Sequence, residues 1–429
     1  MKPLKEAQNL FFSAFNFDNY LKKEIIPTKE ALGRVTAEPI FARFSSPNFH
    51  CAAMDGYAVN ASMTFGATLE HPKRLLINKE AFPINTGYPL PEGTNAVIMI
   101  EDIVEDGEEI EIKKAVYPWQ NVRKVGEDIV ATELILPPFH RITPYDIGAL
   151  LEAGIFEVSV KEKPKVIIIP TGNEIVPIEV VMKRGIKKGE VIESNSWMLK
   201  ALLESVGALC EIWPIVPDDY EMLKEAIKKS VDSKAHIIVI LAGSSAGSKD
   251  FTATVLEELG EVLVHGVAMM PGKPTILAKI SEKPVIGNPG YSVSSIISFE
   301  KFVLPLLSIM QGFFYEKRPK IKVFLSKSVP SKLGIEEFLR VKIGKVNDKI
   351  IATPLPRMAG SITTLTKAHG IIQIPAQAEG INEDKEIEAE LLVPEEEILN
   401  TIVIIGSHDL TIDLLATELK KKNPFLNIS

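Results

Sequence analysis

The sequence predicts a multidomain α/β protein organised around a doubly wound, parallel sheet. From residue 164 onwards, apolar β-prone runs alternate with amphipathic helical segments, a pattern that gives a parallel sheet with helices on its faces. One of these runs, His236–Leu241, is followed by a stretch of small residues and then by another amphipathic segment. A buried strand that feeds a loop and a helix N-terminus has this pattern. The segments 45–139 and 319–394 are rich in short β-prone runs, which predicts additional β domains.

Composition and charge exclude several classes of protein. A chain of 429 residues should form about three domains, and 46% hydrophobic with 24% charged residues is ordinary for globular domains. The net charge of -8 argues against a nucleic-acid-binding protein, which needs lysine and arginine at phosphates. Cys51 and Cys210 have no paired spacing, so neither a disulfide framework nor a zinc site is expected. We see no secretory signal and no membrane span, and expect a soluble, cytoplasmic protein.

The N-terminal third is expected to hold a helical domain with an insertion. Residues 1–44 and 140–163 should form the helical domain, and residues 45–139 should form an inserted β domain. Apolar residues recur at helical spacing near the N-terminus, and a second short helix is expected after Pro27. Thr143 is the expected N-cap of a further helix, with proline at its first position and aspartate in its first turn.

The central domain, residues 164–318, should contain the parallel sheet. Its strands are expected at Lys165–Ile169, Ile212–Val216, His236–Leu241, Val262–Val264, Thr275–Ile280 and Val285–Ile286. Its helices are expected at Asn195–Val206, Asp219–Val231 and Ser292–Met310, with another ending at Leu259 and a kink or break at Pro305. Ligands bind at the carboxyl ends of such strands, where polar loops follow three of them.

The C-terminal part is expected to contain a small barrel or sandwich and a tail. Strands in residues 319–394 are expected at Ile321–Leu325, Phe338–Ile343, Ile350–Thr353, Gly370–Ile374 and Ile387–Val393. The tail, residues 395–429, should add a strand at Thr401–Ile405 and a helix at Leu410–Leu419. One strand and one helix cannot bury a core of their own.

Several short phrases place polar residues beside glycine, where tight turns can aim side chains outwards. They are AMDGYA (53–58), TGYPLPEG (86–93), NVRKVGEDI (121–129), TGNEIV (171–176), PGKP (271–274) and GNPG (287–290). Taken singly, each phrase is also compatible with ordinary turn chemistry and surface charge.

In this order, the phrases resemble the molybdopterin molybdenumtransferase family, MoeA and the E domain of gephyrin, over residues 1–394. The resemblance implies an elongated helical domain, an inserted β domain, a molybdopterin-binding α/β domain and a C-terminal barrel. It also implies a homodimer with its active site between subunits. The implied reaction inserts molybdate or tungstate into adenylylated molybdopterin and releases AMP with the help of Mg²⁺, downstream of a molybdopterin adenylyltransferase. The tail is similar to the start of a binding-protein-like domain that some archaeal-type members carry.

The resemblance implies a set of catalytic residues that are mostly acidic. They are Thr86, Asp128, Glu174, Asp218 and Asp250, of which Glu174, Asp218 and Asp250 would hold the metal. Two like charges about 4 Å apart repel by about 4 kcal/mol at an effective dielectric of 20, so carboxylates facing an anionic substrate need a cation. Mg²⁺ prefers such oxygen ligands. The competing interpretation of these residues is helix capping and solvated loop charge.

Small and basic residues form the implied substrate-binding set. They are Gly243, Ser244, Ser245, Gly247, Ser248, Lys249, Pro271, Gly272, Lys273, Asn288, Pro289, Arg340 and Ser361. The loop 242–250 allows backbone N–H groups to approach an anion. Arg340 and Ser361 are equally compatible with a surface arginine and a turn serine. Met270 and Gly266 stand where some members carry lysines, which leaves molybdate and tungstate both open.

Two other functions remain open at this point. The related adenylyltransferase shares the α/β domain, but it usually lacks the flanking domains. A non-catalytic scaffold would keep the fold and bind a partner peptide, whereas the acidic residues favour catalysis.

Overall fold

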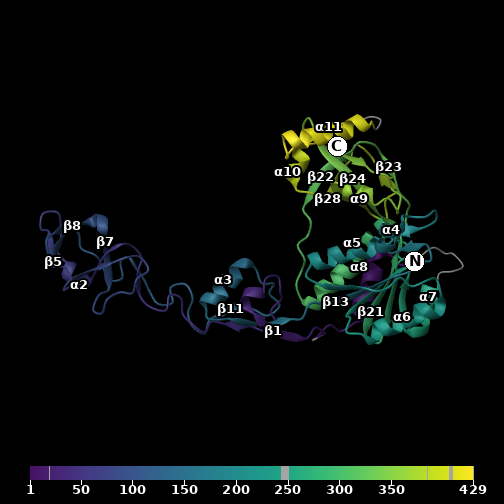
Figure 1. Ribbon diagram of the computed structural model, residues 1–429. Coiled ribbons are helices and arrows are strands. Elements are labelled where there is room, and N and C mark those ends of the chain that lie inside the picture. Colours follow the sequence, from purple (N-terminus) through teal and green to yellow (C-terminus); the bar gives the residue numbers. More distant parts are fainter. Residues whose placement is uncertain (19, 243–250, 384, 405–408, 429) are drawn as a thin grey trace. The chain divides into compact units, whose positions relative to one another are not determined.

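The computed structural model describes residues 1–18, 20–242, 251–383, 385–404 and 409–428. The chain divides into two compact units (Figure 1). Unit 1 consists of Met1–Leu21 and Lys163–Ser429, and unit 2 consists of Lys22–Glu162.

Unit 1 contains a six-stranded sheet with the strand order β16-β13-β17-β21-β20-β18. The strands are β13 (Lys165–Pro170), β16 (Leu209–Ile212), β17 (Ile237–Ala242), β18 (Glu261–His265), β20 (Ile276–Ile280) and β21 (Lys283–Pro289). The first four strands in this order are parallel, whereas β20 and β18 are antiparallel to their neighbours. The expectation of an all-parallel sheet is therefore wrong at this edge. No helix separates β18, β20 and β21 in the chain, and short connections give antiparallel pairs.

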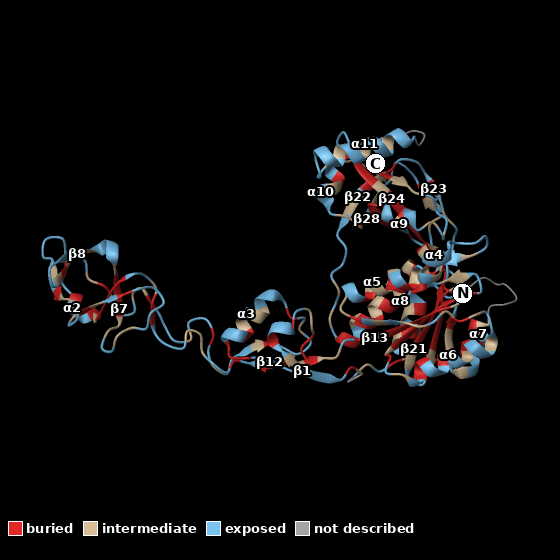
Figure 2. Cartoon of the chain, in the orientation of Figure 1, coloured by how far each residue is buried: buried red, intermediate tan, exposed pale blue. Residues whose placement is uncertain are grey.

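Helices cover both faces of this sheet, which confirms the doubly wound arrangement (Figure 2). One face packs against α1 (Leu4–Ser13), α5 (Asn195–Ser205) and α8 (Ser292–Gln311), and the other packs against α6 (Tyr220–Asp232) and α7 (Thr252–Leu259). Successive residues of β13 alternate between the two cores: Ile168 faces α5 and α8, and Ile169 faces α6 and α7.

Helix α8 continues through Pro305 to Gln311, so the expected break is absent. By length and composition it could cross a membrane, and it is the one described helix that could. Twelve of its residues are buried, and its apolar side chains belong to the core of unit 1.

The strand expected at Ile212–Val216 lies earlier, at Leu209–Ile212. Pro214 lies inside the expected range and Pro217 directly follows it, and neither proline has the backbone N–H that pairing in a sheet needs. The earlier residues Leu209–Ile212 pair with Lys165–Ile168 instead.

Five strands close into a barrel in the C-terminal part of unit 1, which decides between the expected barrel and sandwich. They are β22 (Lys320–Leu325), β24 (Glu336–Val346), β25 (Lys349–Pro354), β26 (Gly370–Ile374) and β28 (Glu386–Leu391). The pairing runs β24-β25-β22-β28-β26 and returns from β26 to β24. Alternate inward-facing residues such as Leu339, Val341 and Ile343 fill the interior.

The tail packs against the barrel. It contains α10 (Glu395–Leu399), β29 (Thr401–Ile402), α11 (Leu410–Lys422) and β30 (Asn427–Ile428), which is parallel to β29. A Cβ on Gly344 of β24 would lie 2.2 Å from Cγ2 of Val403, so glycine there leaves the space that the tail fills. Residues 405–408, which include the end of the strand expected at Thr401–Ile405, lie outside the described residues.

Unit 2 is built mainly from short strands. They are β1 (Lys23–Pro27), β2 (Ile40–Phe41), β3 (Cys51–Ala52), β4 (Gly56–Val59), β5 (Lys73–Leu76), β6 (Ala81–Ile84), β7 (Ala96–Met99), β8 (Ile103–Asp106), β9 (Glu109–Ile112), β10 (Val122–Arg123), β11 (Leu134–Leu136) and β12 (Glu157–Lys161). Two three-stranded sheets, β6-β4-β7 and β5-β9-β8, carry the apolar core of the middle segment. The helices are α2 (Ala61–Thr64) and α3 (Pro144–Glu152).

The structure corrects the helical expectation for residues 1–44. Helix α1 is present, but residues 23–27 form a strand paired with β12, and only a 3-10 turn, Thr28–Glu30, follows Pro27. β12 alternates valine with polar residues, and the β-branched Ile25 and Ile26 of β1 suit pairing with it. Cross-strand pairing with distant residues therefore determines the structure of residues 23–27.

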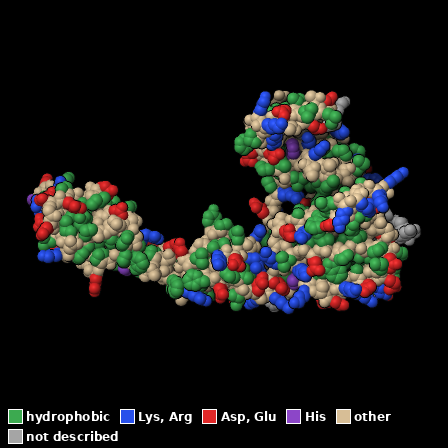
Figure 3. Space-filling view, viewed as in Figure 1, with side chains coloured by type: hydrophobic (Ala, Val, Ile, Leu, Met, Phe, Trp, Pro, Cys, Tyr) green, Lys and Arg blue, Asp and Glu red, His purple; other side chains and the backbone are tan. Residues whose placement is uncertain are grey.

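Charged side chains of both signs are interspersed over the face of the molecule in Figure 3. Many form exposed ion pairs, such as Lys320–Glu388 at 3.0 Å and Lys322–Glu386 at 2.9 Å. Exposed pairs of this kind contribute little to stability, so the packed cores carry most of it.

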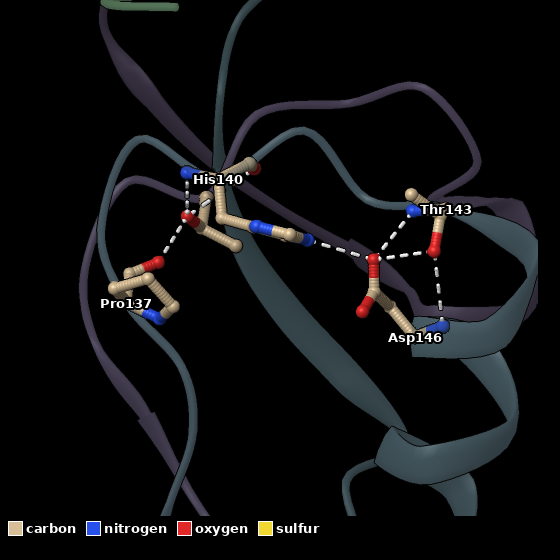
Figure 4. Close-up of polar contacts among 5 residues, drawn as sticks. Pro137, His140, Thr143 and Asp146 are labelled. Carbon is tan, nitrogen blue, oxygen red and sulfur yellow. Dashed lines mark hydrogen bonds and ion pairs between the residues drawn. The ribbon is translucent and has the colours of Figure 1, made fainter.

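The N-terminus of α3 has the predicted cap (Figure 4). The Thr143 hydroxyl accepts the N–H of Asp146 at 3.3 Å, and the Asp146 carboxylate accepts the N–H of Thr143 at 2.6 Å. His140 Nε2 lies 2.7 Å from the same carboxylate oxygen. Partial burial raises the pKa of Asp146, but the hydrogen bonds from His140 and Thr143 outweigh burial and leave this pKa below its ordinary value.

Asp146→Ala is expected to destabilise unit 2 by about 1 kcal/mol at neutral pH, because it removes the cap of α3. Since the pKa of Asp146 is lower in the folded chain, its stabilisation is present above about pH 4 and is lost as the pH falls through the folded value. Thermal unfolding at several pH values measures this effect. Asp102→Ala, which removes an exposed acid of the same unit, is the control and should change little. An equal loss in the control would attribute the effect to net charge.

Candidate active site at the carboxyl edge of the sheet

Hydrogen bonds join the loops that follow two parallel strands of unit 1 to the end of a third. After β13, Thr171 donates from its N–H and its hydroxyl to the Leu241 carbonyl of β17, at 3.0 and 2.8 Å. The Gly172 N–H donates to the carbonyl of Val216, in the segment after β16, at 3.1 Å. This edge is where α/β sheets bind ligands.

The predicted residues Glu174 and Asp218 lie on these joined loops. The N–H of Asp218 donates to Oδ1 of Asn173 at 3.2 Å, and the N–H of Asn173 donates to Oδ2 of Asp218 at 3.4 Å. Glu174 follows directly, and both Glu174 and Asp218 are exposed. The reciprocal pair therefore holds two exposed carboxylates on neighbouring loops.

Gly172 is required for the path of this loop. Its φ is +138°, and a Cβ there would lie 2.9 Å from Cγ1 of Ile175 and 3.1 Å from both carboxylate oxygens of Glu174. Any side chain would push the Glu174 carboxylate away.

A pocket of about 610 Å³ opens beside these loops. It is lined by Pro170, Thr171, Glu174, Ile175, Val191, Ile192, Glu193, Ser194, Asn195, Leu241, Pro274, Gly290, Tyr291, Ser292 and Gly360. Its volume lies in the range of small-molecule sites. The lining comes from the sheet edge, the N-termini of α5 and α8 and one loop of the barrel.

One wall of the pocket belongs to a flap, residues 174–193. Its base is formed by β14 (Ile175–Val176) and β15 (Val191–Ile192), which pair in parallel, and its outer part by α4 (Ile178–Arg184). Arg184 stabilises the turn at residues 185–189 by donating to both carboxylate oxygens of Glu190 at 2.9 and 2.7 Å. These hydrogen bonds and the Lys187 N–H lower the pKa of Glu190 to about 2.

Part of the predicted anion-binding loop lies outside the described residues. The predicted site residues that are not described are Gly243, Ser244, Ser245, Gly247, Ser248, Lys249 and Asp250. Among the residues that the structure describes, no group of three or more His, Cys, Asp and Glu side chains is arranged to hold a metal ion. The predicted trio includes Asp250, so it remains a prediction.

The PGKP and GNPG phrases contain both buried and exposed residues. In PGKP, which follows the short strand β19 (Met269–Met270), Pro271 and Gly272 are buried and Lys273 is exposed. In GNPG, Asn288 is fully buried and donates to the hydroxyl of Ser295 at 2.7 Å, and Pro289 is also buried. Asn288 therefore helps to fix α8 against β21.

Arg340 is 1% exposed, so it is not a surface arginine. Its guanidinium donates to the carbonyls of Pro356 at 2.8 Å and Met358 at 3.4 Å and to the hydroxyl of Thr364 at 3.3 Å. Burial lowers its pKa. The contacts hold the loop 356–361, whose residue Gly360 lines the pocket.

The same loop joins the barrel to α8. The Val293 N–H donates to the Ala359 carbonyl at 3.0 Å, and a Cβ on Gly360 would lie 3.3 Å from the Tyr291 ring. The predicted Ser361 lies at the start of a turn, where its carbonyl accepts the hydroxyl of Thr364 at 2.6 Å. Arg340 thus stabilises the loop 356–361, which contributes Gly360 to the pocket wall.

In unit 2, Thr86 contacts a carboxylate that is not among the residues predicted from the sequence. Asp55 Oδ1 accepts the Thr86 N–H at 2.7 Å and its hydroxyl at 3.0 Å, and these two bonds lower the pKa of Asp55. The AMDGYA phrase contains Asp55 and was the signal for it. Asp128 is exposed on another turn, where its N–H donates to the Ser46 carbonyl at 3.1 Å.

Family models match most of the chain. The MoeA N-terminal region (domain I and II) matches residues 2–154, a probable molybdopterin binding domain matches 167–308, and the MoeA C-terminal region (domain IV) matches 322–392. The chain belongs to the MoeA family. The family takes part in molybdenum cofactor biosynthesis, and the chain is an enzyme of that process.

MoeA relatives resemble the chain along its length. A molybdopterin biosynthesis protein of Methanocaldococcus jannaschii is 36% identical over 91% of this chain and 98% of its own length. The molybdopterin molybdenumtransferase of Haemophilus influenzae is 31% identical over 79% of this chain and 85% of its own length. A MoeA crystal structure from Pyrococcus horikoshii has a TM-score of 0.77 at 35% identity, covering 91% of this chain and 99% of its own.

Arg340→Lys is expected to lower the free energy of unfolding of this MoeA-family chain by about 1–3 kcal/mol. One ammonium group cannot replace a planar guanidinium that donates to four oxygens, which include the Phe338 carbonyl at 3.3 Å. Chemical denaturation measures this loss. Arg357→Lys is the matched control, since the half-exposed Arg357 makes a charged contact with Glu337 that lysine can keep. Equal losses in both variants would contradict a special role for Arg340.

Proposed function

We propose that this MoeA-family enzyme inserts molybdate or tungstate into adenylylated molybdopterin and releases AMP. The observation that carries the proposal is the pairing of Asn173 with Asp218, which sets Asp218 and Glu174 on one sheet edge, with Glu174 on the pocket wall. This site lies in the part of the chain matched by the molybdopterin binding domain. Relatives that carry the name molybdopterin molybdenumtransferase support the same activity.

Mg²⁺ fits the described part of this edge. Glu174 and Asp218 supply exposed carboxylate oxygens, the ligand type that Mg²⁺ prefers, and each keeps room for the water ligands that this ion retains. Glu174 and Asp218, with the predicted Asp250, would hold the ion. When bound, Mg²⁺ would offset the charge of phosphate and oxyanion groups.

We also propose a cytoplasmic homodimer whose two sites are shared between subunits, and which takes its substrate from a molybdopterin adenylyltransferase. The sequence resemblance to the family supports this assembly. In unit 2, exposed apolar side chains such as Phe41, Phe44 and Phe156 are available for an interface.

The direct test incubates the protein with adenylylated molybdopterin, Mg²⁺ and either molybdate or tungstate. We expect AMP release that requires both the metal and one of the oxyanions, measured by chromatography of the nucleotide. The oxyanion that supports the faster release identifies the cargo. Absence of release with both oxyanions would reject the proposed activity and favour a scaffold.

A further inference from the structure

Glu193 is a buried acid on the wall of the pocket. It is 7% exposed, and it stands between β15 of the flap and the first turn of α5. Its N–H donates to the Val176 carbonyl at 2.9 Å, which fixes its backbone to the flap. Its carboxylate oxygen Oε1 accepts the N–H of Ser196 at 2.8 Å.

The carboxylate of Glu193 lacks an ionic partner among the described residues. The other buried glutamate, Glu337, receives hydrogen bonds from Arg357 at 2.9 Å and Ser331 at 2.8 Å. For Glu193, the described residues supply only the Ser196 N–H, and its Oε2 receives no hydrogen bond from them. A buried charge is costly unless paired, and one helix N-terminus compensates for only part of the cost.

The rest of the pocket suits the faces of a flat aromatic ring. Ile175, Val191, Ile192 and Leu241 form apolar walls, and Tyr291 adds an aromatic ring at the rim. A pocket with apolar walls and one buried acceptor selects a planar ligand that carries hydrogen-bond donors on one edge.

We infer that Glu193 recognises the amino-pyrimidine edge of the pterin. This inference rests on the proposed function. The edge presents the 2-amino group and N3–H side by side, a planar pair of donors that matches a carboxylate as a guanidinium does. Each carboxylate oxygen has two acceptor positions, so Oε1 can keep the Ser196 N–H while both oxygens accept from the ring.

Glu193→Gln separates this role from helix capping. The glutamine has nearly the same shape, and its amide oxygen can still accept the Ser196 N–H. It loses one acceptor oxygen and the charge. Stability should therefore change little, whereas recognition of two adjacent donors should be lost.

The experiment compares 6-hydroxymethylpterin with 6-hydroxymethyllumazine, in which a carbonyl replaces the 2-amino group. Binding of each to the full chain is measured by fluorescence titration or ligand-observed NMR. For the unsubstituted chain we expect the pterin to bind about tenfold to a hundredfold more tightly than the lumazine. Glu193→Gln should reduce this ratio to near one while its melting temperature stays unchanged. Ser194→Ala, a neighbouring change on the same pocket wall, should keep the ratio.

The inference fails if the unsubstituted chain does not prefer the pterin, or if Glu193→Gln keeps the preference. AMP release in the unsubstituted chain tests the proposed activity separately. A chain that releases AMP while Glu193→Gln keeps the pterin preference would overturn only the role of Glu193. A preference that depends on Glu193 without AMP release would support the inference and reject the activity.

Discussion

Glu174→Gln and Asp218→Asn are each expected to reduce AMP release by about a hundredfold or more, with little change in the melting temperature. Both carboxylates are exposed on loops, so neither change opens a cavity in the core. The amides keep the shape and one acceptor oxygen, which preserves the hydrogen bond from the Asn173 N–H to residue 218. They remove the negative charge that would hold Mg²⁺. Nucleotide chromatography and a thermal scan on the same samples measure the two effects.

Asp219 provides a matched control beside Asp218. Its carboxylate accepts the N–H of Met222 at 2.9 Å and caps α6, so its role is structural. Asp219→Ala should lower stability by about 1 kcal/mol and leave AMP release nearly intact. If Asp218→Asn behaves like Asp219→Ala, Asp218 belongs to the capping structure and its assignment to the site is wrong.

A mixture of Asp128→Ala and Asp250→Ala chains is expected to recover about a quarter of the normal activity, although each variant alone is inactive. Asp128 belongs to unit 2, and Asp250 follows β17 of unit 1 in the sequence. In the proposed shared-site dimer, a mixed dimer has one doubly damaged site and one intact site. Random co-folding makes half of the dimers mixed, and half of their sites are intact.

The mixing experiment needs two controls. Differently tagged chains must be shown to form mixed dimers, and a mixture of Glu174→Ala with Asp250→Ala should stay inactive because both changes lie in unit 1. Inactive mixtures of Asp128→Ala with Asp250→Ala, despite proven mixed dimers, would mean that both residues act within one chain.

Local sequence patterns predicted the parts of the fold that local physics determines. The alternation of strand and helix, the barrel strands and the Thr143 cap all follow from periodicity or from capping within a few residues. The first strand of unit 2 was missed because β1 owes its form to β12, more than a hundred residues later in the chain. Pairing over such a distance cannot be inferred from residues 23–27 alone, because the alternation of valine with polar residues lies in β12.

The site shows the same division. Glycine-rich phrases and acidic residues after strands located the sheet edge. Two features of that region could not be predicted. In the sequence, Arg340 is equally compatible with a surface position, and its burial depends on the later residues Pro356, Met358 and Thr364 that accept its hydrogen bonds. Glu193 resembles an ordinary acid before a helix, and only the pocket distinguishes it.

The two ends of unit 2 meet in space. The N–H of Lys22 donates to the carboxylate of Glu162 at 2.8 Å, and the N–H of Glu162 donates to the Lys22 carbonyl at 2.7 Å, at the open end of the β1–β12 ladder. Because the two ends of this segment are adjacent, it has the geometry of an inserted domain. If it were deleted, a short turn could join Leu21 directly to Lys163. The chain can therefore have acquired or exchanged this segment in a single genetic step without rethreading the sheet of unit 1.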